Sequence, residues 1–132
     1  MRPLDDNAGE AAGRSLAVLA ETLFLTNLML LPGIAFAVLA MLWLKHRHSA
    51  PPLARQHLRQ ATWVSLWGGF LIVALGGLIL LVGGLGEAWT WVTLILYFTC
   101  IHSTLILFGM VALAKAIAGQ RWRYPLIGPR LE

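Results

Sequence analysis

The sequence predicts an all-α integral membrane protein: a single transmembrane domain, residues 1–132, built as a bundle of three helices. Three observations predict this fold class. Hydrophobic residues make up 58% of the 132 residues and charged residues only 12%, whereas soluble domains carry about 45–50% and about 25%. Three apolar stretches are each long enough to cross a bilayer as a helix. The alternation of apolar and polar residues that marks a membrane β-strand is missing.

The first apolar stretch covers residues 16–44 and is interrupted by Glu21, Asn27 and Pro32. It exceeds the about 20 residues that the hydrocarbon core requires, so we expect one long span that either tilts or starts as an interfacial turn before it enters the membrane. In that arrangement Glu21 lies near the outer interface and reaches water. A polar loop at 45–60 follows, in which Pro51 and Pro52 end the preceding helix.

The second stretch, residues 61–85, and the third, residues 89–113, contain no Asp, Glu, Lys or Arg. The intervening residues include Gly83, Gly84 and Gly86, which predict a tight turn between two antiparallel helices. Residues 114–132 then form a basic tail.

Basic residues predict the orientation of the three spans. Eight of the ten Lys and Arg residues lie in the loop 45–60 and in the tail. The positive-inside rule therefore predicts a multi-pass protein of the bacterial inner membrane, with its N-terminus outside and its C-terminus in the cytoplasm. Contact with anionic lipids explains the formal net charge of +4, and we expect no nucleic acid partner.

Small side chains predict where helices pack, because helices in lipid gain little from burying leucine against leucine. One face of the second span carries such a row: Ala61, Ser65, Gly69 and Gly77. We expect this row to contact other membrane subunits or further copies of the chain. Trp63 and Trp67 lie on a different face, and we interpret them as headgroup anchors rather than as a stacking surface for a cofactor.

His102 is the one ionisable residue deep in the predicted bilayer, so it is the main candidate for chemistry. Two interpretations remain open: a structural hydrogen bond, with Asn27 as partner, or a role as ligand, proton relay or partner contact. A haem held between two histidines within the chain is not expected, because the other histidines lie in the loop. Cys100 and His102 point about 200° apart on a helix, which argues against a copper site. We therefore predict no resident cofactor and no metal.

Two further segments carry a family resemblance. Residues 52–61 combine Pro52 with His57 and a Gln60-Ala61 pair. Residues 114–125 end a helix with Gly119 and continue with Trp122, Tyr124 and Pro125. Both segments resemble motifs of a bacterial family of small membrane proteins of unknown function. That family is distantly related to the twenty-kilodalton component of the chloroplast inner-envelope protein translocon, and the resemblance implies no activity.

The residues of these motifs also have a physical interpretation. His57 and Gln60 lie one helical turn apart and can bond the end of a neighbouring helix. Gly119 can end the third helix in a left-handed conformation, and Trp122 and Tyr124 can anchor the tail at headgroup level. We expect the His57 and Tyr124 segments to contact each other at the cytoplasmic face.

The predicted function is non-enzymatic: a small accessory or scaffolding subunit that packs against a larger inner-membrane complex, with lipids and other membrane subunits as partners. No catalytic constellation occurs in the sequence. One alternative is an electron-transfer subunit that binds a cofactor or quinone through His102. A second alternative is a small oligomeric transporter lined by the polar residues Asn27, Thr99, His102, Ser103 and Thr104.

Overall fold

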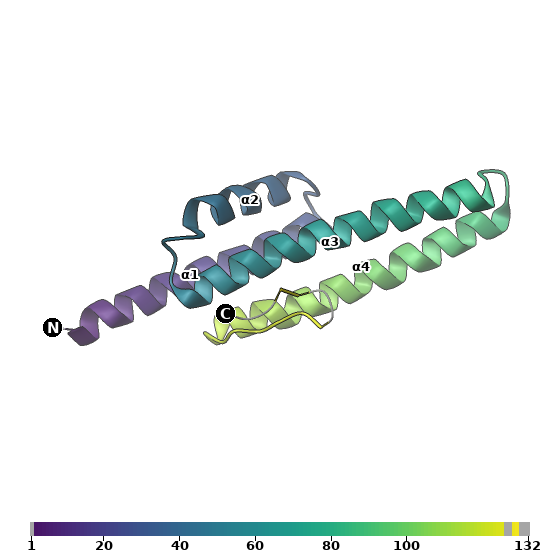
Figure 1. Ribbon diagram of the computed structural model, residues 1–132. Coiled ribbons are helices and arrows are strands. Elements are labelled where there is room, and N and C mark those ends of the chain that lie inside the picture. Colours follow the sequence, from purple (N-terminus) through teal and green to yellow (C-terminus); the bar gives the residue numbers. More distant parts are fainter. Residues whose placement is uncertain (1, 126–127, 130–132) are drawn as a thin grey trace.

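The computed structural model describes residues 2–125 and 128–129 and forms four α-helices over these ranges. They are α1 (Arg2–Met29), α2 (Ile34–His46), α3 (Pro52–Gly83) and α4 (Ala88–Ile117). The predicted all-α class is confirmed, but the predicted bundle of three helices is wrong. Helices α3 and α4 form a long antiparallel pair, and the shorter α2 lies along one side of the molecule (Figure 1).

The first predicted span is two helices that fold back on each other. Helix α1 ends at Met29, and α2 starts at Ile34. Between them, Pro32 has no backbone N–H to offer and Gly33 takes a φ of 85°, so the helix cannot continue and the chain reverses. Helix α1 packs against α2, α3 and α4, while α2 packs against α1 and α3. Residues 16–44 therefore form a helical hairpin and not a single crossing.

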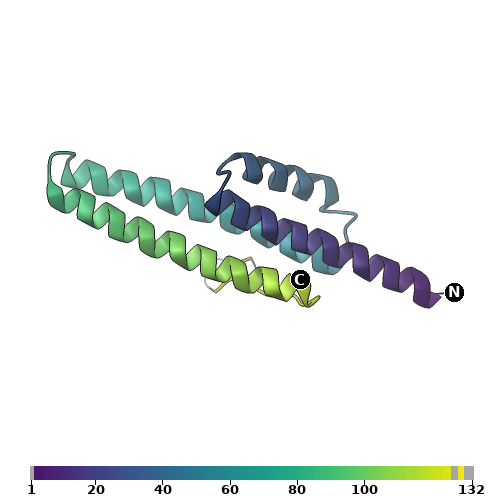
Figure 2. The ribbon, with the colours of Figure 1, turned by 180° about the vertical axis from the view of Figure 1, so that it is seen from behind.

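The predicted placement of the termini on opposite sides of a membrane is not supported by this hairpin. The first residues of α1 and the described segment after α4 lie toward the same end of the molecule as the short 47–51 connection (Figures 1 and 2). A side chain built at Gly13, near the middle of α1, would lie 3.1 Å from the Pro51 ring, so this part of α1 neighbours that connection. We call this end the basic end, and the turn from Gly84 to Glu87 the far end.

Two helices are long and apolar enough to cross a membrane. Helix α3, with 32 residues, contains an 18-residue window with a mean hydropathy of 2.3, and α4, with 30 residues, contains one of 2.0. At about 1.5 Å per residue they are about 45–48 Å long. Helix α2 has 13 residues, about 20 Å, which is too short to span. Helix α3 begins at Pro52, so residues 52–60 are helical and not a loop.

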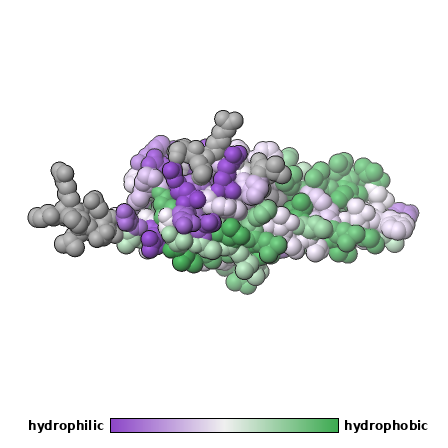
Figure 3. All heavy atoms as spheres, turned by 90° about the horizontal axis from the view of Figure 1, so that it is seen from below, coloured by the Kyte–Doolittle hydropathy of each residue, from purple (hydrophilic) through white to green (hydrophobic). Residues whose placement is uncertain are grey.

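The buried core lies in the half of the molecule that contains the basic end. It joins all four helices and the segment after α4, with Phe24, Leu39, Leu58 and Tyr124 fully buried. Hydrophilic side chains gather around this half, and hydrophobic ones cover much of the long α3–α4 pair beyond it (Figure 3). The core thus fixes the segment after α4 against α1 and α3.

Candidate functional site

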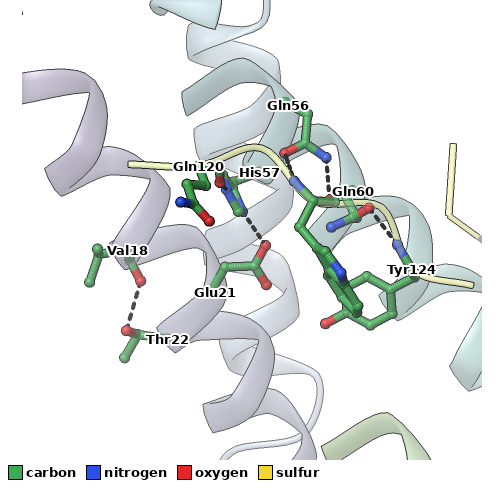
Figure 4. Close-up of polar contacts among 9 residues, drawn as sticks. Val18, Glu21, Thr22, Gln56, His57, Gln60, Gln120 and Tyr124 are labelled. Carbon is green, nitrogen blue, oxygen red and sulfur yellow. Dashed lines mark hydrogen bonds and ion pairs between the residues drawn. The ribbon is translucent and has the colours of Figure 1, made fainter. Parts of the chain in front are cut away.

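A buried polar network joins α1, α3 and the segment that follows α4. The His57 ring lies with its Nδ1 atom 2.7 Å from Oε1 of Glu21 and its Nε2 atom 2.9 Å from the backbone oxygen of Gln120. Both side chains of the pair have zero exposure. Figure 4 shows the imidazole between the two partners, which come from elements far apart in the sequence.

The two partners determine how protons are arranged in this network. A backbone carbonyl can only accept, so Nε2 of His57 carries a proton and donates it to Gln120. Exactly one further proton then lies between Nδ1 and Glu21, either on the imidazole or on the carboxyl. Burial raises the pKa of the Glu21 carboxyl, and the hydrogen bond and charge of His57 partly offset that rise. The pair is therefore electrically neutral overall, which suits its burial.

Neighbouring glutamines of α3 hold the chain after α4 by its backbone. Gln56 donates from Nε2 to the backbone oxygen of Trp122 at 2.7 Å and accepts from the backbone N–H of Trp122 at 3.4 Å. Gln60 accepts from the backbone N–H of Tyr124 at 2.9 Å. The contacted positions, 120, 122 and 124, alternate along the chain, as expected for an extended segment that presents every second residue to one surface.

Aromatic packing completes the docking of this segment. The Tyr124 ring is fully buried and lies 5.6 Å from Phe24 in an edge-to-face arrangement, 6.2 Å from Phe108 and 5.0 Å from Trp122. Burial, with a smaller contribution from the negative charge of Glu21, raises the pKa of the Tyr124 phenol far above its usual value. The phenol therefore stays protonated. Gly119 has a φ of 71°, which turns the chain from α4 into the docked segment.

Three buried polar atoms of this network have no hydrogen-bond partner among the described residues: Oε2 of Glu21, Nε2 of Gln60 and the hydroxyl of Tyr124. The amide nitrogen of Gln60 and the Tyr124 hydroxyl both point toward the side where Glu21 lies (Figure 4). In other proteins such groups are commonly satisfied by an ordered water.

His102 and Asn27 are not hydrogen-bonded to each other. The Asn27 side-chain oxygen accepts from the backbone N–H of Gly33 at 2.9 Å and so caps the turn between α1 and α2. The His102 ring stacks on Phe98 with centroids 5.0 Å apart. Both residues line one apolar groove of about 810 Å³ between the hairpin, α3 and α4, together with Ser65.

The predicted small-residue row divides into two parts in the structure. Ala61 is buried, whereas a side chain built at Gly69 or Gly77 would meet nothing within 4 Å. The glycines that approach α4 are their neighbours: a side chain at Gly68 would lie 2.9 Å from Leu105, and one at Gly76 would lie 3.5 Å from Leu94. Within the chain, therefore, Gly69 and Gly77 are not the packing residues.

The structure brings together the predicted cluster of His57, Gln60, Trp122 and Tyr124, with Gly119 at its start and the exposed Pro125 beside it. Sequence reasoning missed Glu21, the acidic partner of His57. A carboxyl group in an apolar helix was the available signal, because such a group requires a partner when it is buried. Whether any of these residues acts in function stays a prediction.

Comparison with known protein families gives a match over most of the chain. The model of the magnetosome magnetite crystal formation protein family matches residues 12–131. No curated protein and no solved structure matches the chain.

Proposed function

The chain belongs to the magnetosome magnetite crystal formation protein family, and from this premise we propose that it is a non-enzymatic accessory protein of the magnetosome membrane. Its work is to hold other membrane subunits, or further copies of itself, where the crystal forms. The family match supports the predicted resemblance to a bacterial family of small membrane proteins. A relation to the chloroplast translocon stays a prediction.

The proposed arrangement in the membrane is two spans, α3 and α4, with the α1–α2 hairpin entering from the basic end and returning to it. The distribution of charge supports this. All Lys and Arg residues of the described ranges lie in α1 before residue 15, in 45–59 or in 115–123, whereas the far-end turn carries Glu87 alone. The positive-inside rule then places the basic end, with both termini, in the cytoplasm.

The open face of α3, which contains Gly69 and Gly77, is the observation that supports the accessory role. Gly69 and Gly77 have no neighbour in front of them, although α3 already packs on α4 through Gly68 and Gly76. A row of small residues that the fold leaves uncovered allows a further helix to approach closely.

The test measures association of the intact protein extracted from its own membrane in mild detergent. We expect the double variant Gly69→Leu and Gly77→Leu to weaken association about tenfold, which corresponds to about 1.4 kcal/mol. Ala74→Leu is the matched control, because Ala74 is exposed on α3 and lies about 100° around the helix from the centre of the row, Val73. The contact assignment is refuted if native mass spectrometry finds the same amount of complex for the unsubstituted protein, the double variant and the Ala74→Leu control.

A second candidate is binding of a quinone-like ligand, an apolar molecule with a hydrogen-bonding ring. The groove around His102 favours it, because the groove is almost wholly apolar and adds Asn27 and Ser65 as polar groups. Photolabelling with an azido-quinone tests this candidate. Labelling of the groove that His102→Leu abolishes would support it, and labelling that is unaffected by the substitution would remove it.

A further inference from the structure

The protein has a different cross-section at its two ends. Toward the basic end, α1 and α2 pack around α3, and α1 also packs on α4. Beyond the turn between α1 and α2, only α3 and α4 continue to the far end (Figures 1 and 2). Four helices therefore fill one half of the molecule's length, and two helices fill the other half.

The hairpin ends near the middle of the apolar part of α3. Pro32 and Gly33 at its tip line the same groove as Gly69 and Val73 of α3. The apolar part of α3 starts at Ala61, so Gly69 lies eight residues further in, a depth of about 12 Å. The hairpin therefore reaches about half-way through a hydrocarbon core of about 30 Å. The tip lies close to the boundary between the two leaflets.

The outer face of α2 is built for lipid. Ile34, Met41 and Leu44 expose 65%, 69% and 60% of their surface, and the helix carries no charge before Lys45. Such a face is costly in water and favourable in acyl chains.

The backbone of the turn at the hairpin tip is suited to the same surroundings. The N–H groups of Leu30 and Leu31 both donate to the oxygen of Thr26, and that of Gly33 donates to the Asn27 side chain. Pro32 has no N–H. These bonds satisfy three of the turn's donors, which lowers the cost of placing the turn within the bilayer.

We propose that the protein is a membrane wedge that favours bilayers convex on the side of its basic end. The inference rests on the topology proposed above. The hairpin adds two helices, each about 10 Å in backbone and side-chain diameter, to one leaflet and none to the other. Lipids pack around such a shape without voids when the leaflet that holds four helices is the outer, expanded one. Insertion into a single leaflet is the general basis of curvature preference.

The experiment uses the full-length protein reconstituted into vesicles of one phosphatidylethanolamine–phosphatidylglycerol mixture but a range of diameters. A dye is attached through Ser49→Cys, in the connection at the basic end, in a Cys100→Ser background. The ratio of protein to lipid fluorescence is measured vesicle by vesicle. We expect this ratio to rise severalfold from large to small vesicles for molecules whose dye is accessible to an external quencher. Molecules inserted the other way should become rarer as the diameter falls.

A variant pair separates the hairpin from the rest of the protein. Ile34→Asp with Met41→Asp removes the lipid affinity of the α2 face and should flatten the dependence on diameter. Ile34→Leu with Met41→Leu keeps that affinity and should leave the dependence intact. Equal density at all diameters for the unsubstituted protein, or enrichment with the basic end inward, would overturn the proposal. A failure of the Gly69 and Gly77 association test would leave this result untouched, so the two proposals fail separately.

Discussion

Replacing His57 by leucine tests whether the buried network holds the fold together. The substitution removes the 2.7 Å bond to Glu21 and the 2.9 Å bond to the Gln120 backbone. Both side chains of the pair have zero exposure, so bulk water cannot replace the bond between them. Breaking a buried pair by removing one partner costs about 3–5 kcal/mol. We expect a loss of that size in the free energy of unfolding.

The measurement is reversible unfolding in mixed micelles, followed by tryptophan fluorescence in a background where Trp122, which packs on Tyr124 beside the network, is the single tryptophan retained of the six. His102→Leu is the matched control. The described contact of His102 is a ring stack on Phe98, so that variant should lose less than about 1 kcal/mol.

A double variant sharpens the test. Glu21→Leu together with His57→Leu removes both polar partners, and two apolar side chains in their place are often tolerated. The double variant should therefore be more stable than His57→Leu alone, although the Gln120 carbonyl still lacks its donor. If His57→Leu costs less than about 1 kcal/mol, or if the two losses simply add, the network is not the stabilising element inferred here.

Two further predictions concern pH and topology. Burial raises the pKa of Glu21 above its ordinary 4.5, so the stability it contributes is full below about pH 4.5 and is lost as the pH rises through the raised pKa. Unfolding should thus become easier by up to about 1.4 kcal/mol per pH unit in that window, and Glu21→Gln should remove the slope. In a Cys100→Ser background, Ser15→Cys and Ser49→Cys should react with a membrane-impermeant maleimide from the same side, and Glu87→Cys from the opposite side. If the maleimide instead labels Ser15→Cys and Glu87→Cys from the same side, residues 16–44 cross the membrane once and the hairpin topology is wrong.

The two long helices could be predicted from the sequence because their signal is uninterrupted. Residues 61–85 and 89–113 hold no Asp, Glu, Lys or Arg, and glycines mark the turn between them. The hairpin could not be predicted from length and hydropathy alone, because a tilted helix and two short helices give the same apolar count. The decisive feature was local: Pro32 followed by Gly33, in a stretch several residues longer than one crossing requires.

The site was predicted only in part, for the same reason. The motifs around His57 and Tyr124 suggested that their segments meet, and the structure brings them into contact through Gln60. A single crossing by residues 16–44, which the sequence predicts, puts Glu21 near the opposite membrane face. When that stretch folds back, the same residue comes to lie beside His57. An error in topology therefore concealed a side-chain contact.

The sequence separation within the buried network has a consequence for how the protein is made. Glu21 emerges 36 residues before His57, and His57 emerges 63 residues before Gln120. Early in synthesis the Glu21 carboxyl group has no imidazole with which to share a proton. The His57 imidazole can bond the Gln120 carbonyl only after both α3 and α4 have been synthesised. The network closes last, so its formation reports that insertion is complete.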